Sequence, residues 1–514
     1  YPFERGEVSR DEALAYRNES GEVYKVQLIE ELPADAVITF YTQGEFTDLC
    51  RGPHVPSTGK IKNFKLTQVT GAYFKGNEKN KMLTRIYGTA FEKKSELEDY
   101  LKALEEAKLR DHNKIGRDLG YFMTSDVIGQ GLPLLMPKGA RLFQILSRFV
   151  EDEERKRGYV LTKTPYMAKS DLYKISGHWD HYKDGMFVMG DEEKDEEVYA
   201  LRPMTCPFQY TVYNNGLKSY RDLPIRYGET STLFRNESSG EMHGLIRVRQ
   251  FTLSEGHIIC MPSQLEKEFR GCLDLAMFML KSLGLDGDVS YRFSKWDPVN
   301  KEKYIDDPEE WAYAEGEMKR ILDHIGLNYT EGIGEAAFYG PKLDIQIKNV
   351  HGKEDTLITI QIDMFLAERF DMSYIDEKGE KVRPYIIHRS SIGCYERTMA
   401  LLLEKYAGAL PVWLSPTQVK VLSLTDRTAD IAKETADKLN EAGLRAECDL
   451  RNEKIGYKIR EAQLEKIPYM LIIGDKDVEN NVVSVRSRKE GDLGTMSYEQ
   501  FFMKIKEEND GKVL

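Results

Sequence analysis

The spacing of hydrophobic and polar positions changes twice along the chain, and these changes divide it into three parts. In the first part, up to about residue 110, residues 36–41 and 83–87 have the pattern of short strands, with a turn-rich stretch at 50–56 between them. A highly charged segment over 93–117 then carries leucines at roughly helical spacing, at positions 97, 101, 104 and 109. We expect one helix here, leading from the first part into the second.

The middle part runs from about 120 to 410 and mixes amphipathic helices with strands of alternating pattern. A turn at 137–139 precedes an amphipathic helix over 140–157, and residues 159–165 have the pattern of a strand. The acidic run 191–197 is expected to be a solvated loop.

The last part follows Pro411 and alternates regularly between strand and helix patterns. Strands are expected at 419–424, 445–450 and 469–474, and helices at 429–439, 454–466 and 498–506. Thr425 is a candidate N-cap and Gly443 a stop signal. This alternation predicts an independent α/β domain with a mostly parallel sheet.

Composition places the chain among globular proteins. Its 514 residues predict about three domains, and 41 % hydrophobic with 31 % charged residues excludes a disordered, collagenous or membrane-embedded protein. The longest apolar stretch, 273–280, is too short to span a bilayer. The net charge of −12 argues against a general nucleic-acid coat, so any positive charge for nucleic acid must be concentrated locally. Six irregularly spaced cysteines favour a reducing, cytoplasmic compartment. Because the chain opens without methionine, we expect a fragment of a longer protein.

Two segments of the middle part could bind a nucleotide. Residues 232–237 and 245–253 alternate as two strands around a loop of small residues, which predicts a hairpin whose charged face carries Arg235 and Glu237. Arginine neutralises phosphate and a carboxylate holds Mg²⁺ or an amino group, although a cross-strand ladder of ion pairs explains the same pattern. In the second segment, 388–397, Ser390 or Ser391 could cap a helix from which Arg397 faces either a ligand or solvent.

A third set of residues could hold a metal ion. Cys206, His257 and His388 would suit Zn²⁺ with an open fourth position. Their long, irregular spacing also fits a buried cysteine and two hydrogen-bonded histidines. A rival pairing joins His257 to Cys260.

Taken together, these segments resemble the class II aminoacyl-tRNA synthetases. Residues 234–237 resemble the second family signature, 393–397 the third, and Pro165 fits the first, which usually builds the dimer interface. Longer stretches resemble threonyl-tRNA synthetases in particular: 177–180, 204–207, 216–224, 242–249, 338–342 and 451–460. The resemblance implies an α+β multidomain protein. A partial editing domain (1–110) precedes a catalytic domain built on an antiparallel sheet (111–411), and an α/β anticodon-binding domain (412–514) follows.

The resemblance also implies roles for single residues. Cys206, His257 and His388 match the zinc ligands that hold the amino group and hydroxyl of threonine. Arg235 and Arg397 match arginines on the phosphates of ATP, which binds with Mg²⁺. The other positions matched to substrate, ATP or the tRNA terminus are His178, Met204, Glu237, Arg247, Glu255, Tyr339, Lys342 and Gln361. Threonine, ATP and tRNA(Thr) are the implied partners, and a homodimer is the implied assembly.

The chain departs from the family pattern in the centre and in the first part. Glu255 stands where an aspartate accepts the threonine hydroxyl, and Leu253 replaces a polar side chain. Lys25, Asp48, Cys50 and His54 match residues that clear mischarged serine, but the His-x-x-x-His segment that the family uses with them is absent. We therefore expect aminoacylation with impaired editing.

The last part supplies candidates for contact with the anticodon: Glu453, Lys458, Arg460, Arg486 and Arg488. Two other functions compete with the ligase. A non-catalytic RNA-binding paralogue conflicts with the intact signature arginines, and a zinc hydrolase lacks a local ligand motif and a general base beside the metal ligands.

Overall fold

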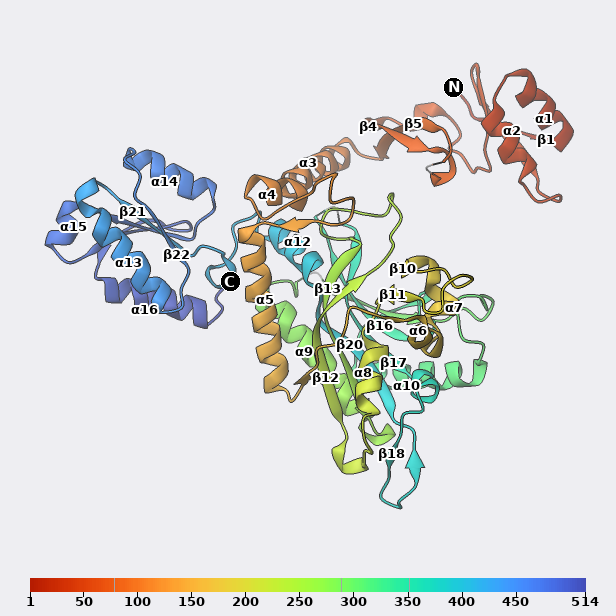
Figure 1. The fold of residues 1–514 in the computed structure, drawn as a ribbon. Coiled ribbons are helices and arrows are strands. Elements are labelled where there is room, and N and C mark those ends of the chain that lie inside the picture. Colours follow the sequence, from red (N-terminus) through yellow and green to blue (C-terminus); the bar gives the residue numbers. More distant parts are fainter. Residues whose placement is uncertain (78, 288, 351) are drawn as a thin grey trace. The chain divides into compact units, whose positions relative to one another are not determined.

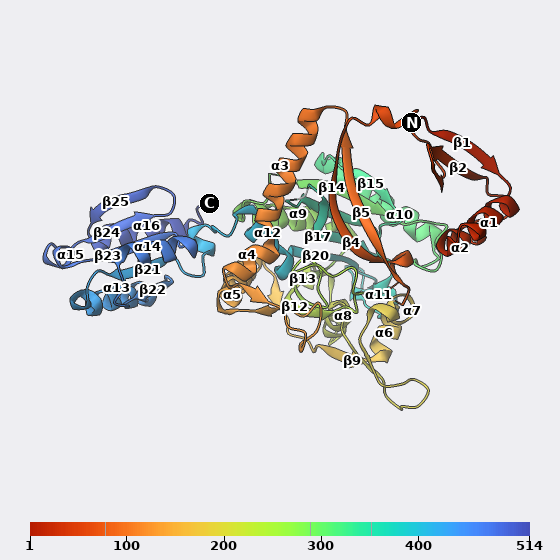
Figure 2. The ribbon, with the colours of Figure 1, turned by 90° about the horizontal axis from the view of Figure 1, so that it is seen from above.

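The computed structural model describes residues 1–77, 79–287, 289–350 and 352–514. The chain forms two compact units, 1–106 and 107–514, each described here by itself. Figures 1 and 2 show the elements from two directions. The α+β class expected from the sequence is confirmed.

The first unit contains a small antiparallel sheet and a long hairpin. Strands β1 (Glu4–Val8), β2 (Ile38–Gln43) and β3 (Phe46–Leu49) form the sheet, which packs with helices α1 (Arg10–Glu19) and α2 (Val23–Glu30) around a core of Ala13, Ile29, Ile38 and Phe40. Strands β4 (Asn63–Tyr73) and β5 (Met82–Phe91) pair only with each other among the described residues. The two strands expected here are present.

The expected helix over 93–117 is two helices. Helix α3 spans Lys94–Arg110 and α4 spans His112–Asp118. Asp111 between them leaves the helical conformation, and its carboxylate accepts from the amides of Asn113 and Lys114. Because an aspartate at this position satisfies the free N–H groups of a new first turn, it ends one helix and starts the next.

An eight-stranded sheet forms the centre of the second unit, in the order β15-β14-β16-β17-β20-β13-β12-β8. Its strands are β8 (Val160–Leu161), β12 (Ile225–Phe234), β13 (Gln250–Cys260), β14 (Val289–Lys295), β15 (Thr330–Ile333), β16 (Lys342–Lys348), β17 (Glu354–Asp363) and β20 (Tyr385–Cys394). All neighbours are antiparallel except at the two edges, where β15 and β8 run parallel to their partners.

The two faces of this sheet pack against different hydrophobic cores. The side chains of Ile258 and Ile387 lie in the largest hydrophobic core, with helices α5 (Pro137–Lys156), α9 (Leu265–Ser282) and α12 (Tyr395–Lys405). Their neighbours Ile259 and Ile386 lie in a second core with helix α8 (Cys206–Tyr213). Because strand side chains alternate between faces, residues 257 and 388 turn toward α8.

Smaller elements surround the sheet. The helices are α6 (Ser170–Ser176), α7 (His178–Tyr182), α10 (Pro308–Ile325) and α11 (Leu366–Arg369). The strands are β6 (Phe122–Met123), β7 (Leu134–Leu135), β9 (Met167–Lys169), β10 (Val188–Met189), β11 (Tyr199–Leu201), β18 (Tyr374–Ile375) and β19 (Lys381–Val382).

Three local predictions in this part were wrong in their boundaries. The 137–139 turn is the first turn of α5, because Pro137 stands at a position where a missing N–H costs nothing. The strand expected over 159–165 is only β8. The predicted hairpin exists, but its last pair joins Phe234 to Gln250, so Arg235, Glu237 and residues 245–249 lie in the connection beyond the strand ends.

The C-terminal part carries a five-stranded sheet in the order β22-β21-β23-β24-β25. Its strands are β21 (Val419–Ser423), β22 (Ala446–Asp449), β23 (Tyr469–Ile473), β24 (Val483–Ser487) and β25 (Gly491–Met496), and its helices are α13 (Ala429–Glu441), α14 (Ile455–Leu464), α15 (Asp475–Glu479) and α16 (Tyr498–Asp510). The expected strands and helices are confirmed. The sheet is mixed rather than mostly parallel, because β24 and β25 add an antiparallel hairpin that was not predicted.

No helix among the residues that the structure describes is long and apolar enough to cross a membrane.

Candidate active site and metal centre

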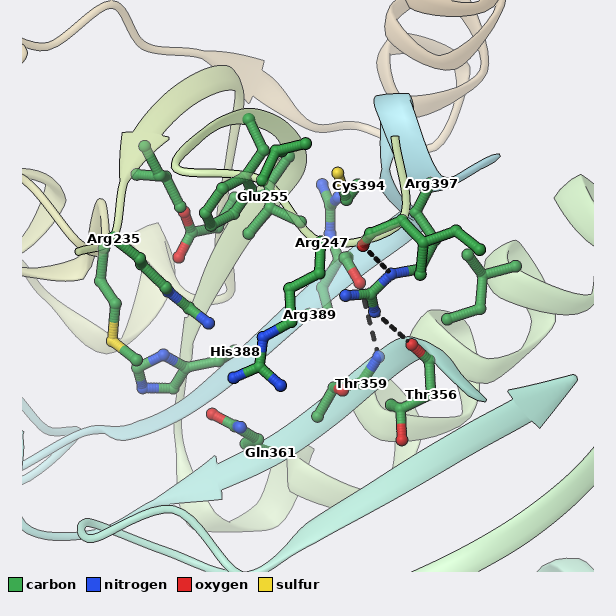
Figure 3. A pocket seen from close by; sticks show the side chains of 18 of the residues that line it. Arg235, Arg247, Glu255, Thr356, Thr359, Gln361, His388, Arg389, Cys394 and Arg397 are labelled. Atoms are coloured by element: carbon green, nitrogen blue, oxygen red, sulfur yellow. Dashed lines mark hydrogen bonds between the residues drawn. The ribbon is translucent and has the colours of Figure 1, made fainter. Parts of the chain in front are cut away.

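A cavity of about 300 Å³ opens on the face of the central sheet opposite the large core. Figure 3 shows side chains from β13, β17, β20, α12 and the β12–β13 connection converging on it. Nine of the residues singled out in the sequence line it: Met204, Arg235, Glu237, Arg247, Glu255, Tyr339, Gln361, His388 and Arg397. Segments that are far apart in the sequence therefore build one site.

Four arginines line the cavity, Arg235, Arg247, Arg389 and Arg397, and Arg389 is paired with Glu154 at 2.6 Å. Arg397 stands in the first turn of α12 and donates to the carbonyl oxygens of Ile246 (3.0 Å) and Thr356 (2.5 Å). Arg235 lies over the ring of Phe251, 5.1 Å from its centroid, and its buried Nε atom has no hydrogen-bond partner among the residues that the structure describes. This arrangement suits a polyanionic ligand such as a triphosphate.

The carboxylate of Glu237 is paired within the same connection. Arg247 contacts its Oε2 atom through Nη2 at 2.8 Å, and Arg249 donates to its backbone carbonyl oxygen over 3.0 Å. The ion pair expected between strands is present, but it spans the connection rather than a ladder. Glu237 therefore faces the cavity on a backbone that Arg249 holds in place.

The three proposed metal ligands meet beside this cavity. The side-chain ligand atoms of Cys206, His257 and His388 all lie within 4.8 Å of one another, and all three residues are buried. His257 and His388 are direct partners across β13 and β20, which places their rings side by side. The rival pairing with Cys260 is not formed, because a residue three positions along a strand points to the other face, and Cys260 lies in the large core.

Hydrogen bonds assign the protons of both rings. Nε2 of His388 donates to Oδ2 of Asp363 over 2.8 Å, because a carboxylate only accepts. In the neutral ring, Nδ1 then carries a free lone pair. Nδ1 of His257 donates to Oε1 of Gln209 over 2.6 Å, which leaves its Nε2 atom as a lone pair. These two acceptor atoms face each other at 3.1 Å.

Two facing lone pairs repel unless a cation lies between them. Burial lowers the pKa of His257, which favours a neutral ring that can bind a metal ion through a lone pair. Two nitrogens bound to one tetrahedral zinc ion, each at ~2.0–2.1 Å, stand roughly 3.3 Å apart, close to what is observed. One thiol, two correctly oriented imidazoles and an adjacent cavity therefore fit a zinc ion with an open position.

Glu255 connects the metal ligands to the cavity. Its Oε2 atom accepts from Oγ1 of Thr205 over 2.6 Å, and its Oε1 atom lies 3.7 Å from Nε2 of His257. Burial raises the pKa of this carboxyl group. Leu253, the other departure from the family pattern, also lines the cavity, beside a register shift in β13 that separates it from Glu255.

Three regions of the chain match family descriptions. Residues 187–406 match the tRNA synthetase class II core domain (G, H, P, S and T), residues 418–508 an anticodon binding domain, and residues 38–87 the threonyl and alanyl tRNA synthetase second additional domain. The chain is 68 % identical over 499 residues to the threonine–tRNA ligase of Clostridium botulinum (strain Alaska E43), covering 97 % of this chain and 77 % of that protein.

The chain belongs to the threonine–tRNA ligase family. It is also 50 % identical over 508 residues to the threonine–tRNA ligase of Halalkalibacterium halodurans, covering 99 % of this chain and 78 % of the relative. Among solved structures, the RNA binding domain of threonyl-tRNA synthetase from Cryptosporidium parvum superposes with a TM-score of 0.73 at 34 % identity, covering 77 % of this chain and 98 % of that one.

Lys342 and His178 lie next to the cavity without lining it. Lys342 pairs with Asp344 at 2.5 Å and stands opposite Gln361 in the sheet. His178 is buried, and burial lowers its pKa to about 3, so its ring is neutral. Nε2 of His178 lies 2.9 Å from the sulfur of Met204, which can only accept a hydrogen bond, and Nδ1 lies 2.7 Å from Oγ of Ser176.

The residues matched to editing meet in the first unit. Lys25 pairs with Asp48 at 2.8 Å, and the buried Arg17 holds the same carboxylate at 3.2 Å. Nε2 of His54 lies 3.1 Å from Sγ of Cys50. Arg17 was not singled out in the sequence.

Two of the anticodon candidates, Lys458 and Arg488, donate hydrogen bonds to the backbone of their own chain. Lys458 is buried, and its ammonium group donates to the carbonyl oxygens of Ser423 and Asp449. Arg488 donates to the carbonyl oxygens of Ala409 and Leu410. Lys458 is buried, Arg488 is half-buried, and both cations are bound to backbone carbonyl oxygens.

The other anticodon candidates remain accessible. Glu453 and Arg460 are exposed, and Arg486 forms an ion pair with Asp492 at 3.2 Å.

Sequence reasoning missed several residues of the cavity and of its support. Thr356 and Thr359 line the cavity from β17. A bulge in that strand beside Leu357 puts Thr356 on this face, and no sequence pattern marks the bulge. Gly393 packs against it with a φ of +74°. The predicted serine cap is absent, because β20 continues through Ser390 and Ser391 to Cys394.

Proposed function

We propose that this chain activates threonine with ATP and transfers it to the 3′ end of tRNA(Thr). One observation carries the proposal: Arg235, Arg247 and Arg397 line the same cavity as His388, and the ligand atoms of Cys206 and His257 lie within 4.8 Å of that of His388. A site for a triphosphate beside a site for an amino acid is what adenylate formation needs. Family membership over nearly the whole chain supports the same reaction.

In the first step the carboxylate of threonine attacks the α-phosphorus of ATP, and pyrophosphate leaves. Arg235 and Arg397 bind phosphate oxygens and neutralise charge that grows in the transition state. Glu237 faces the same space and would hold Mg²⁺ that accompanies ATP. The protein therefore contributes mainly orientation and charge, as in other phosphoryl chemistry.

Threonine is selected at the deep end of the cavity. A zinc ion held by Cys206, His257 and His388 would bind the amino group and hydroxyl of threonine. Glu255, fixed by Thr205, is placed to accept the hydroxyl proton. Valine has the same shape but leaves these polar groups unpaired, and such a site rejects the analogue more strongly than an apolar pocket does.

The second step joins the activated threonine to the terminal ribose. His178 has a neutral ring beside Met204, which lines the cavity, and it is our candidate for accepting the proton of the ribose hydroxyl. Tyr339 donates to Gln361 over 2.7 Å and stacks on His388, which keeps it beside the reacting groups. The exposed Glu453 and Arg460, with Arg486, are the candidates for contact with the anticodon.

We further propose that this chain of 514 residues, tested as it stands, clears mischarged Ser-tRNA(Thr) poorly. Lys25 pairs with Asp48 and His54 contacts Cys50, and the His-x-x-x-His segment that the family uses with them is not among these residues. Incubation with Ser-tRNA(Thr) tests this. Deacylation close to the uncatalysed rate is expected, and rapid deacylation contradicts the proposal.

A homodimer through the edge of the central sheet completes the proposal. Strand β8 is that edge, and Val160 and Leu161 on it are 53 % and 60 % exposed. Tyr166 and Met167, which follow in the sequence, are also exposed. Unpaired strand edges with exposed apolar side chains favour association with another chain.

All six cysteines are free thiols, which supports the cytoplasmic location expected from the sequence. The direct test of the whole function is aminoacylation of a tRNA(Thr) transcript with labelled threonine. Charging that requires ATP, threonine and this tRNA supports the proposal, and the absence of charging by folded protein contradicts it.

A further inference from the structure

Behind the metal ligands, polar side chains that are buried, apart from the half-buried Thr162, form a chain of hydrogen bonds that ends on His257. Oε1 of Gln209 lies 2.6 Å from Nδ1 of His257, and Nε2 of Gln209 donates to Oγ1 of Thr162 over 2.7 Å. Thr162 donates to Oε2 of Glu229 over 2.9 Å, and Arg202 holds Glu229 at 3.2 Å. Gln209, Glu229 and Arg202 are at most 1 % exposed, so water does not replace their partners.

This chain of hydrogen bonds has one self-consistent direction. A carboxylate only accepts, so the hydroxyl of Thr162 gives its single hydrogen to Glu229. The hydroxyl oxygen then accepts from the amide nitrogen of Gln209, which turns the amide oxygen toward His257. An amide oxygen also only accepts, and the hydrogen of His257 is therefore fixed on Nδ1. The lone pair of His257 is left on Nε2, the atom that faces His388.

Gln209 reaches this position because of where it stands on α8. It follows Cys206 by three residues, and residues three apart share one face of a helix. Thr205, immediately before the cysteine, holds Glu255. One short segment, 205–209, thus carries the metal ligand Cys206 and the two side chains that orient Glu255 and His257.

We propose that Gln209, oriented by Thr162, is a positioning residue of the metal centre, which fixes the ring of His257 for metal binding and thereby sets the affinity for zinc and the rejection of valine. The inference rests on the proposed function and deepens it. Gln209 itself acts only through His257.

The test compares variants of Thr162 that differ in a single group. Thr162→Val removes the hydroxyl but keeps the shape, so the amide of Gln209 is free to turn its nitrogen toward His257. Thr162→Ser keeps the hydroxyl. Thr211→Val is the matched control, because Thr211 lies on the exposed side of α8, the helix that carries Gln209, and its hydroxyl donates to the carbonyl oxygen of Pro207.

Zinc affinity is measured by competition with a chromophoric chelator, and ligand geometry by the visible spectrum of the cobalt-substituted protein. We expect Thr162→Val to weaken zinc binding by about 10–100-fold and to change the cobalt spectrum, because outer groups of metal ligands have effects of this size. Thr162→Ser and Thr211→Val should match the wild type. A folded Thr162→Val protein with wild-type zinc affinity and spectrum overturns the inference.

A second variant keeps the test valid if Thr162→Val folds poorly. Gln209→Met removes the acceptor for His257 and should weaken zinc binding at least as much. The double variant should be no worse than Gln209→Met alone, because both act through one chain of hydrogen bonds. Additive losses contradict the inference. A wild-type protein that binds no zinc contradicts the proposed metal centre itself, and the two failures are therefore distinguishable.

Discussion

The guanidinium group of Arg397 is bound to the backbone of Ile246, since its Nε atom donates to that carbonyl oxygen over 3.0 Å. This single bond joins the first turn of α12 to the connection that carries Arg247 and Glu237. Nη1 of the same side chain donates to the carbonyl oxygen of Thr356. Arg397 therefore orders the walls of the cavity as well as supplying charge to it.

Replacing this arginine should impair activation far more than folding. Arg397→Lys keeps the charge but cannot serve two carbonyl oxygens and a phosphate together. We expect kcat/KM for ATP in pyrophosphate exchange to fall by about 10²–10³-fold, the usual effect of losing one transition-state donor. Lys405→Arg, exposed at the other end of α12, is the control and should leave exchange unchanged. An active Arg397→Lys enzyme contradicts the assignment.

Gly393 should tolerate no side chain. It has a φ of +74°, and an added Cβ atom would lie 1.9 Å from the carbonyl oxygen of Leu357. Because neither backbone can yield inside the sheet, Gly393→Ala should lower the free energy of unfolding by more than about 3 kcal/mol.

Gly271→Ala serves as the control for this glycine. It lies on the exposed side of α9 with open space around it, and should be neutral or stabilising by about 0.5–1 kcal/mol. Chemical denaturation of both variants checks the prediction, and equal stabilities would refute it.

Zinc uptake should release a proton. Burial raises the pKa of the Cys206 thiol well above its ordinary value, so the metal-free protein holds this group protonated at neutral pH. A metal binds the thiolate, and about one proton per site should therefore leave. Calorimetry in buffers of different ionisation enthalpy measures that number. Proton release that persists unchanged in Cys206→Ser would mean that this cysteine is not a ligand.

The proposed dimer should dissociate when its edge strand is charged. Val160→Glu combined with Leu161→Glu puts two carboxylates on β8, whose side chains are exposed in the single chain. Light scattering should then give the mass of one chain. Leu464→Glu, on the exposed surface of α14, is the control and should remain dimeric. A wild-type protein that is monomeric at micromolar concentration contradicts the dimer.

Local patterns predicted the elements whose stability is mostly local. The strands and helices of the C-terminal part were predictable because each is short, periodic and bounded by turn residues. The extent of β20 was not, because its backbone groups are satisfied by β13 and β17, which lie far away in the sequence. That tertiary pairing keeps Ser390 and Ser391 in a strand where the local pattern predicts a helix start.

The site was predictable in its residues but not in their arrangement. His257 and His388 are 131 positions apart, and only the register of β13 against β20 makes them neighbours. Lys458 and Arg488 show that the role of a single cation can also be hidden in the sequence. A sequence reports that a cation is present, but not that backbone carbonyl oxygens bind it inside the fold.

The central claim is tested most directly by amino-acid-dependent exchange of pyrophosphate into ATP, with threonine, serine and valine in parallel on zinc-loaded protein. The account predicts strong exchange with threonine, weaker exchange with serine and almost none with valine, because valine leaves the hydroxyl-binding groups unpaired. No exchange with threonine by folded, zinc-loaded protein would contradict the account. In that case the chain would be a non-catalytic relative. Leu253 and Glu255 would then be the first residues to replace, with a polar residue and an aspartate as in the family pattern.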